Sequence, residues 1–527
     1  MLCEECLLNN CVQNSCIGLL WHYNNFRNKP PLKRVTPHGV GRCPQGRGDR
    51  SVRGGPAKLV EGFYRNSLSS VSEFFAPDRK IYVAENENMC YNREVMPSEA
   101  ALSNRSLLWL QNPVQQADTA TLPERKNVPM QYKFAENVDA LQPSAIREIL
   151  KFTSMPGVIS FAAGNPAPEA FPVDTIRKIS AELFEKDPIL ALQYNITEGY
   201  PKLRDLLKQR MAAQQCFDAD ADDLITTSGA QQANELSCKV LLNRGDTLFC
   251  EAPSFIGSLN AFRSYGVDLV GIPMEQDGMD LAAMEEAVKA SKSPKLVYVI
   301  PNFQNPTGRV MSLEKRKGLY ELACKYDFII LEDNPYGDLR FAGSDVPSIK
   351  SMDTEHRVIY SGTFSKILAP GLRVGYVSAP KEIIAKITVC KQVADVHTNI
   401  WAQAVCAEFL ERTDMDTYLE KLRAVYRRKC NLMADGIRRH FSSKVQWEMP
   451  QGGLFLWCTL PDDCDMPAFC TKAVQEYSIA VVPGNAFLVD EAAPTTSFRL
   501  NFSTPSDEQI VKGIEILGGM TKKILGA

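Results

Sequence analysis

The sequence predicts an α/β protein, with a mostly parallel β-sheet that helices cover on both faces and a smaller α+β domain. Two observations predict this class. From Met130 onward, short apolar runs typical of strands alternate with amphipathic segments typical of helices. Most of these runs end in polar residues or Pro/Gly loops, as LVYVIPNF and FIILEDNPY do. Strands that alternate with helices pair in parallel, and parallel sheets are buried on both faces.

Composition limits the kind of protein. Hydrophobic residues make up 45% and charged residues 23% of the 527 residues, which is ordinary for a globular chain with two or three domains. The formal net charge of -3 gives no sign of a nucleic-acid partner, and no apolar run approaches the roughly 18 residues that span a bilayer. The 16 cysteines are scattered, which favours a reducing compartment. We therefore expect a cytoplasmic protein without nucleic-acid or membrane partners.

Residues 1–129 differ from the rest because they show little periodicity of either kind. Three interpretations compete: a disordered basic arm, a targeting peptide, and upstream sequence outside the functional protein, with Met130 as the true start. The third is favoured, since regular patterning begins at Met130. A zinc site among the four cysteines between positions 3 and 16 is disfavoured, because no second Cys or His pair follows at finger-like spacing. No metal is expected.

The first informative strand end is LITT, which Ser228, Gly229, Ala230 and Gln231 follow at the start of a helix. A turn of small residues that opens a helix offers free N–H groups and the positive end of the helix dipole, as a phosphate site does. Many strand–helix turns contain Ser-Gly, so this motif alone leaves an ordinary turn open as the alternative.

Two further strands end in polar side chains. After LVYVIP, Asn305 precedes a proline, which favours extended geometry and projects the amide. After FIIL, Asp333 ends a buried strand, where a carboxylate needs a cationic partner or several donors. Tyr336 follows three residues later and can present its hydroxyl to the same cavity. An ordinary turn is the alternative for Asn305, and capping of the next turn is the alternative for Asp333.

Lys366 follows the strand RVIYSG, with Thr363 and Ser365 before it and Arg373 after it. Enclosure at a strand end and a nearby cation lower the pKa of an amine, and a neutral amine can form a Schiff base with a carbonyl. Arg373 supplies a charged fork suited to phosphate. Alone, Lys366 would be a surface lysine. Together with the other strand-end residues, it indicates a pyridoxal phosphate site.

With these motifs, the segment from about Met130 to Ala527 resembles the fold-type I, class I and II aminotransferases, which have the PLP-transferase fold. The motifs NPTG, EDNPY and SK followed by GLRVGY stand in the order of that family. The stretches ALQYNITEGYPKLRDLL, PQGGLFLW, VVPGNAFLVD and SFRLNFS resemble the branch of 2-aminoadipate and kynurenine aminotransferases. The resemblance implies pyridoxal 5'-phosphate as the cofactor.

The resemblance also implies roles for individual residues. Lys366 would bond to the cofactor and then act as general base, and Asp333 would pair with the pyridinium nitrogen. Tyr336 and Asn305 would hold the phenolate oxygen. The phosphate would be bound by residues of the helix start and of the lysine loop: Ala230, Gln231, Thr363, Ser365 and Arg373.

For the substrate, the resemblance implies that Arg499 clamps the α-carboxylate, with Asn305 beside it and with Gly164 bringing backbone close. Phe255 stands where the family stacks an aromatic ring on the cofactor, although many members have Tyr there. Ala230 stands where Ser is common in the family, so Gln231 and backbone N–H groups would contribute more of the hydrogen bonds to the phosphate. Tyr194 matches a tyrosine that reaches the phosphate of the partner subunit, which implies a homodimer.

The implied function is a transaminase that moves an amino group from an L-amino acid of the 2-aminoadipate, aromatic or branched-chain type to a 2-oxo acid, with 2-oxoglutarate expected. Other PLP chemistry, such as β-elimination or decarboxylation, stays open. A cofactor-sensing transcriptional regulator is disfavoured, because residues 1–129 lack a winged-helix pattern. The expected domains are an irregular extension over residues 1–129, a large cofactor-binding domain over residues 165–400, and a small domain made from residues 130–164 and 401–527. No motif fixes the side chain of the donor.

Overall fold

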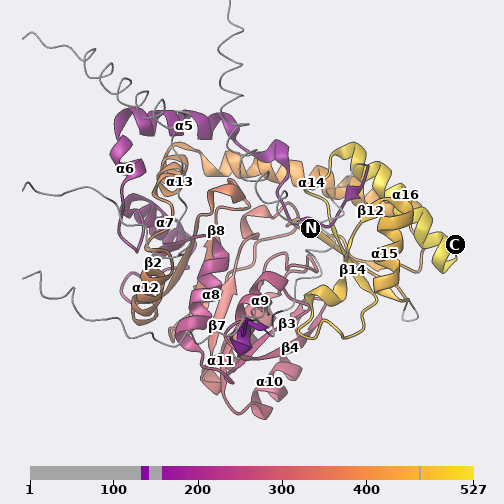
Figure 1. The fold of residues 1–527 in the computed structure, drawn as a ribbon, viewed down its shortest axis with the longest axis horizontal. Coiled ribbons are helices and arrows are strands. Elements are labelled where there is room, and N and C mark those ends of the chain that lie inside the picture. The colour runs from indigo at the N-terminus through magenta and orange to yellow at the C-terminus, as the bar shows by residue number, and fades with distance from the viewer. Residues whose placement is uncertain (1–131, 140, 142–156, 462–463, 527) are drawn as a thin grey trace, which may run out of the picture. The chain divides into compact units, whose positions relative to one another are not determined.

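A computed structural model describes residues 132–139, 141, 157–461 and 464–526. The predictions for residues 1–129 lie outside this part of the chain, and the domain limits stay predictions. The described part contains a large sheet with its helices and a second group of elements that holds α14, α15 and α16 (Figure 1). None of its helices combines the length and apolar character needed to cross a membrane.

The large sheet has eight strands in the order β2-β9-β8-β7-β6-β3-β4-β5. Strands β4, β3, β6, β7 and β8 are parallel, whereas β9 runs antiparallel to both β8 and β2, and β5 runs antiparallel to β4. The strand bounds are β2 Asp222–Thr227, β3 Thr247–Ala252, β4 Asp268–Glu275, β5 Gly278–Met279, β6 Pro294–Val299, β7 Ile329–Asp333, β8 Val358–Thr363 and β9 Gly375–Pro380. The predicted α/β class with a mostly parallel sheet is confirmed.

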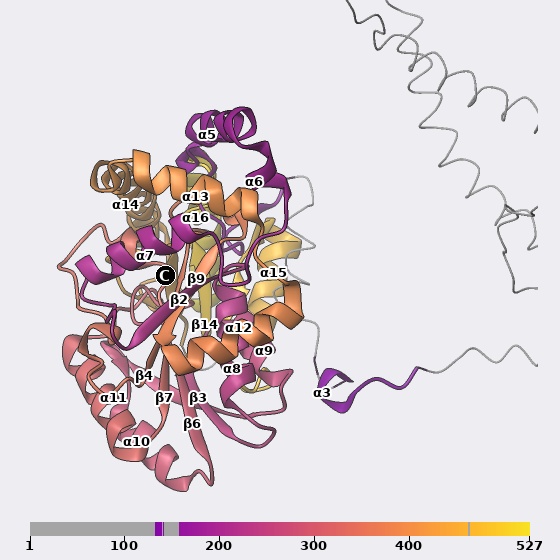
Figure 2. The same cartoon turned by 90° about the vertical axis from the view of Figure 1, so that its left-hand side faces the viewer.

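Helices cover both faces of this sheet, with α10 and α11 on one side and α8 and α12 on the other (Figure 2). The strand β6 shows why both faces need cover. Leu296 and Tyr298 pack into one apolar cluster, while Val297 and Val299 point to the other face and pack into a second cluster. The helix bounds are α5 Val173–Lys186, α6 Pro188–Leu192, α7 Pro201–Ala213, α8 Ala230–Leu241, α9 Ile256–Arg263, α10 Leu281–Ala290, α11 Leu313–Tyr326, α12 Lys381–Asp395 and α13 Ile400–Arg412.

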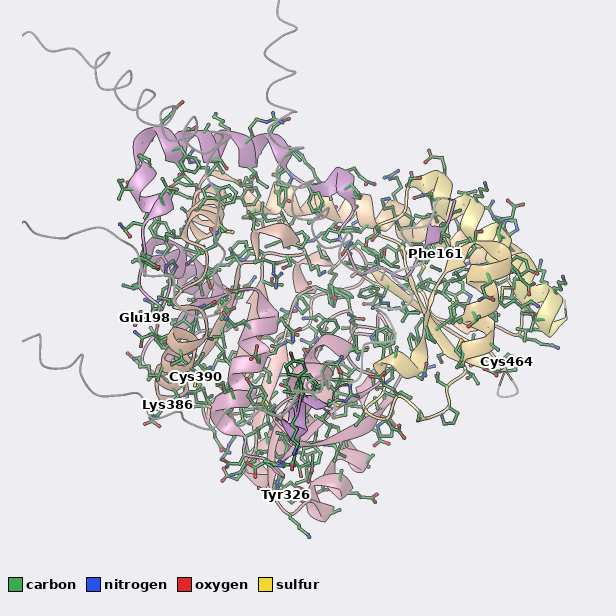
Figure 3. The ribbon with its side chains drawn as sticks, in the orientation of Figure 1. Phe161, Glu198, Tyr326, Lys386, Cys390 and Cys464 are labelled. Atoms are coloured by element: carbon green, nitrogen blue, oxygen red, sulfur yellow. The ribbon has the colours of Figure 1, made fainter. Side chains whose placement is uncertain are left out.

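A smaller antiparallel sheet has the order β10-β11-β14-β13, and β1 pairs in parallel with β12. Phe161, labelled in Figure 3, follows β1 and packs against Gly513 on α16, where an added Cβ would lie 2.6 Å from its ring. The bounds here are β1 Ile159–Ser160, α14 Met415–His440, β10 Gln446–Trp447, β11 Phe455–Thr459, α15 Met466–Tyr477, β12 Ile479–Ala480, β13 Val482–Pro483, β14 Ser497–Asn501 and α16 Asp507–Leu525.

Short helical pieces complete the described part: α3 Glu136–Asp139, η3 Pro168–Ala170, η4 Gly337–Leu339, η5 Lys350–Met352, η6 Pro370–Leu372 and η7 Gly484–Phe487. Because β9 reverses direction relative to both of its neighbours, β2 runs the same way as β8. The carboxyl ends of β2, β3, β6, β7 and β8 therefore meet at one edge of the sheet, which is where ligands of such sheets bind.

Candidate active site

Asp333 is buried at the end of β7. Its Oδ2 atom accepts hydrogen bonds from Asn234 Nδ2 at 2.8 Å and from the Tyr298 hydroxyl at 2.7 Å. Its Oδ1 atom is buried and has no hydrogen-bond partner within the described residues. Burial raises the pKa of Asp333 to about 6, although the two donors lower it. One oxygen is thus held in place while the other is free to accept a hydrogen bond from a ligand.

The two residues that hold Asp333 were missed by the sequence reasoning. Tyr298 stands in an apolar strand, where the sequence gives no sign of a polar role. Asn234 stands one helical turn after Ala230, on the helix α8 that follows the predicted phosphate-binding turn. An amide on the same helix face as Ala230 was the signal in the sequence that could have identified it as a site residue.

Lys366 lies just beyond the end of β8, and its amine donates to the Gly164 carbonyl oxygen at 2.9 Å. The amine also lies 6.0 Å from the centroid of the Tyr336 ring. Burial, and then the positive charges of Arg499 and Arg373, lower the pKa of Lys366 to about 8. Near neutral pH, a far larger share of this amine is unprotonated than for a free lysine, so it can attack a carbonyl or accept a proton.

Asn305 connects two of the predicted residues. Its Nδ2 atom donates to the Tyr336 hydroxyl at 3.4 Å, and its Oδ1 atom accepts from Arg499 at 2.8 Å. All three side chains are buried, and burial raises the pKa of Tyr336, so its hydroxyl keeps its proton. The amide therefore fixes the positions of a hydroxyl and of a guanidinium at the same time.

Arg499, on β14, is a cation with only 3% of its surface exposed. It donates to the Ala162 carbonyl oxygen at 2.7 Å and lies 4.3 Å from the Phe455 ring centroid and 4.8 Å from that of Phe487. Burial lowers the pKa of Arg499 to about 10. Among the described residues, its Nε–H has no acceptor and its guanidinium forms no ion pair with a carboxylate. A buried guanidinium in this state favours an incoming carboxylate.

Phe455 and Phe487 were also missed as site residues, although both stand in the quoted stretches PQGGLFLW and VVPGNAFLVD. Their spacing in the chain gives no hint that both rings flank one arginine. Only the folded backbone brings them together.

The helix α8 begins at Ala230, directly after Gly229, and no side chain of the described residues caps its first turn. Gly229 has a φ of +81°, and an added Cβ would lie 2.3 Å from a guanidinium nitrogen of Arg373. The turn therefore requires glycine on two grounds, a left-handed backbone and the close approach of a cation. The N–H groups of the first helical turn and Arg373 together form a cradle for an anion.

Two hydroxyls line the same cradle. Arg373 donates to the Ser365 Oγ atom at 3.4 Å and to the Ser228 carbonyl oxygen at 3.1 Å. The Thr363 hydroxyl donates to the Ser365 Oγ atom at 2.9 Å. On the far side of the turn, the Ser228 hydroxyl donates to Asp395 at 2.7 Å, a support that the sequence reasoning missed.

Three predicted residues are placed differently. The Gln231 amide donates to the Gly257 carbonyl oxygen at 2.9 Å, and the Phe255 ring lies against the same glycine. Their side chains meet the start of α9 and, in the described part of the chain, form no hydrogen bond with the cradle. Tyr194 is 79% exposed, and its ring meets His397 edge-on with 5.8 Å between centroids. Within one chain, it does not join the other site residues.

These residues fit pyridoxal phosphate. The unpaired Oδ1 atom of Asp333 suits a ring N–H, and the Asn305–Tyr336 pair suits a ring oxygen. The cradle at Gly229 and Arg373 suits a phosphate, and the amine of Lys366 suits an aldehyde.

Comparison with known proteins agrees with this arrangement. The family model described as aminotransferase class I and II matches residues 156–517. The chain is 41% identical over 394 residues to aromatic-amino-acid aminotransferase 1 of Thermococcus litoralis, which covers 74% of this chain and 94% of that protein. It is 36% identical over 395 residues to 2-aminoadipate transaminase of Thermus thermophilus, with 74% and 97% covered.

A solved structure agrees as well. The kynurenine aminotransferase of Pyrococcus horikoshii, crystallised in complex with PMP, KYN and KYA, is 37% identical to the chain. The TM-score is 0.72, and the match covers 75% of this chain and 98% of that one.

Proposed function

The chain belongs to the class I and II aminotransferases, and we propose that it transfers the amino group of aromatic amino acids and of 2-aminoadipate to 2-oxoglutarate. That it is a transaminase dependent on pyridoxal phosphate follows from the family. The donors and the acceptor are the proposal. The observation that carries it is Arg499, a buried guanidinium whose hydrogen-bonding capacity is not filled by the residues that the structure describes.

Arg499 supports the binding of both substrates because an amino acid and a 2-oxo acid share a carboxylate next to the reacting carbon. A guanidinium binds a carboxylate through two parallel hydrogen bonds, which orients as well as attracts it. The flanking Phe455 and Phe487 rings keep water from the guanidinium and strengthen its attraction for an anion. The donor names come from the similar proteins, since this chain resembles aminotransferases named for aromatic amino acids and for 2-aminoadipate.

The residues present would divide the work of the reaction. When bound, pyridoxal phosphate supplies an aldehyde that joins amines and a protonated ring that accepts electrons from the Cα–H bond. Lys366 would hold the cofactor through its amine and, once released by the incoming substrate, would move the proton from Cα. Positioned proton transfer of this kind contributes about 10²- to 10⁴-fold to a rate. Asp333 would hold the proton on the ring nitrogen through its unpaired Oδ1 atom.

The other site residues would bind and orient. Tyr336 and Asn305 would hold the ring oxygen, and Gly164 would bring its backbone next to the substrate. The phosphate would be bound at the start of α8 by the set Ala230, Gln231, Thr363, Ser365 and Arg373. For Gln231 the support is its backbone position in the first helical turn, since its side chain is engaged by Gly257. Phe255 would stack on the cofactor ring.

We also propose a homodimer in which Tyr194 reaches the cofactor of the partner subunit. Tyr194 is one of several large apolar side chains that are exposed on α6, in the segment that follows it, on α12 and just after α12. Exposed apolar surface of this extent is typical of a protein interface. Its large side chains, all more than 45% exposed, are Ile189, Leu192, Tyr194, Ile196, Val389, Val393 and Val396.

A cytoplasmic location is part of the same proposal. Several cysteines are buried as free thiols, among them Cys238, Cys250 and Cys406. Burial raises the pKa of the Cys238 thiol to about 12, so it stays protonated as a small apolar side chain. Free cysteines that are buried as apolar side chains are typical of proteins in a reducing compartment.

The proposal is tested with a panel of amino donors, with 2-oxoglutarate as acceptor and glutamate formation as the readout. We expect the highest kcat/KM with aromatic amino acids and 2-aminoadipate. The panel is run with the full chain and with residues 130–527, and equal activity would show that residues 1–129 are dispensable for catalysis. Release of ammonia, pyruvate or carbon dioxide instead of glutamate would overturn the proposal in favour of another reaction on the same scaffold.

A further inference from the structure

Glu251 is a buried carboxyl near the site that the mechanism above leaves without a role. It stands near the end of β3 and is only 1% exposed. Its Oε2 atom accepts hydrogen bonds from the Ile300 backbone N–H at 3.1 Å and from the Gln304 side-chain amide at 3.2 Å. Its Oε1 atom has no partner within the described residues, and none of its contacts there is with a Lys, Arg or His side chain.

Gln304 links Glu251 to the loop that carries Asn305. The amide of Gln304 also donates to the Pro253 carbonyl oxygen at 2.7 Å. Its Oε1 atom accepts from the Thr307 backbone N–H at 3.0 Å and from the Thr307 hydroxyl at 2.8 Å. Gln304 therefore ties the loop to β3 on one side and closes the turn around Asn305 on the other.

We propose that Glu251 is a positioning residue that fixes Asn305 through Gln304. Asn305 forms hydrogen bonds with both the Tyr336 hydroxyl and Arg499, so a displacement of Asn305 changes the position of both groups. Glu251 would thus set the geometry of the carboxylate clamp without touching substrate or cofactor. The inference rests on the proposed role of Arg499.

The protonation state of Glu251 fits this role. Burial raises the pKa of Glu251 to about 8, although the N–H donors of Ile300 and Gln304 lower it. Near neutral pH the group is a neutral acid, with one oxygen accepting both hydrogen bonds and the other carrying the proton. A neutral Glu251 leaves Asp333 as the charged carboxyl of this region, because two buried like charges disfavour each other.

The proposed role predicts different effects for substitutions that keep the hydrogen bond between Glu251 and Gln304 and for those that remove it. Glu251→Gln keeps one acceptor oxygen and replaces the protonated oxygen by an amide, so we expect kcat and both KM values within about twofold of the original enzyme. Glu251→Ala and Gln304→Ala each break the connection. For both, we expect the KM for donor and acceptor to rise about tenfold, since the loss of a buried hydrogen bond leaves its partner unsatisfied.

A spectroscopic readout separates positioning from general damage. Because Asn305 and Tyr336 are placed to hold the ring oxygen, we expect Glu251→Ala and Gln304→Ala to move the pH midpoint at which the absorbance of bound cofactor changes. Glu251→Gln should leave the midpoint in place. The matched control is Glu332, an equally buried carboxyl on β7 that accepts from the Ile349 and Lys350 backbone N–H groups. Glu332→Ala should lower stability without moving the midpoint or the KM values.

A double-mutant cycle tests whether the effect passes through Asn305. In an Asn305→Ala background, we expect Glu251→Ala to change KM by less than about twofold, because coupled residues are not additive. An equal loss in both backgrounds would overturn the proposal, as would a Glu251→Gln enzyme as impaired as Glu251→Ala. Arg499→Lys is assayed in parallel. If it leaves the KM values unchanged, the proposed clamp itself fails, whereas a raised KM with silent Glu251 variants defeats only this inference.

Discussion

The amine of Lys366 donates to the carbonyl oxygen of Gly164 at 2.9 Å, although the two residues are 202 positions apart. The contact aims the amine into the site and ties the loop after β8 to the segment that follows β1. Since Arg373 and Arg499 both lower the pKa of this amine, its surroundings favour a nucleophile over a permanent cation. Lys366 is therefore the first residue to test.

Replacing Lys366 by Ala should abolish turnover, because both the covalent hold on the cofactor and the general base are lost. We expect a fall in kcat of at least about 10²- to 10⁴-fold, the contribution of positioned proton transfer alone. Borohydride treatment followed by peptide mapping should label position 366 in the original enzyme and nothing in the variant. Lys386→Ala, an exposed lysine of α12 labelled in Figure 3, should behave as the original. Full activity of Lys366→Ala would reject the assignment.

Replacing Asp333 by Asn should leave cofactor bound but remove most of the rate. The amide preserves the shape of the side chain and its contacts with Asn234 and Tyr298 in part, whereas the negative charge that keeps the ring nitrogen protonated is lost. We expect kcat to fall by about 10²- to 10³-fold, as for removal of one electrostatic group. Single-turnover kinetics with a donor amino acid measure the step directly. An Asp333→Ala or →Asn enzyme with unchanged turnover would refute the role.

The rate at which cofactor-free enzyme takes up pyridoxal phosphate covalently should depend on pH through Lys366. Only the neutral amine reacts, so the rate should rise with pH and level off above about pH 8. Arg499→Leu removes a positive charge that favours the neutral amine, so the midpoint should move to higher pH. Arg438→Leu, an exposed arginine paired with Asp435, should leave it in place. A midpoint near that of free lysine in the original enzyme would contradict the site geometry.

Gly229→Ala should weaken cofactor binding, because its Cβ would meet Arg373 and its φ of +81° is strained for alanine. Strain of about 1–3 kcal/mol corresponds to roughly 5- to 150-fold in the Kd of pyridoxal phosphate. Gly371→Ala, two residues from the same arginine, meets no atom within 4 Å and should bind as the original does. Equilibrium titration of cofactor-free enzyme measures both. Equal affinities for the two variants would show that the phosphate lies elsewhere.

Mixing two inactive variants tests the proposed homodimer. If Tyr194 completes the partner's site, Tyr194→Ala and Lys366→Ala homodimers are each impaired. A mixed dimer then contains one site with both original residues and regains part of the activity, up to about half of the original per such dimer. As a control, Leu192→Ala, an exposed residue near Tyr194 in the chain, should gain no activity over its own homodimer when it is mixed with Lys366→Ala. Absence of recovery in verified mixed dimers would mean that Tyr194 acts within its own chain or not at all.

The sequence by itself predicted the sheet and the residues at its carboxyl edge. Asp333 ends β7, and Lys366 and Asn305 stand in the loops that follow β8 and β6, so local pattern set their place near a strand end. Parallel strands then put those ends at one edge, whatever the loops between them do. For these residues, chain position and spatial position are tied together by secondary structure.

Only the tertiary structure decided which buried groups are left unsatisfied. The residue pattern around Arg499 does not indicate a buried charge, and the rings that flank it, Phe455 and Phe487, reach it from other elements. Glu251 lies in an apolar strand whose pattern predicts burial but not its contact with Gln304. Local sequence sets whether a side chain faces inward, whereas its partners come from segments far away in the chain, whose approach is fixed by packing alone.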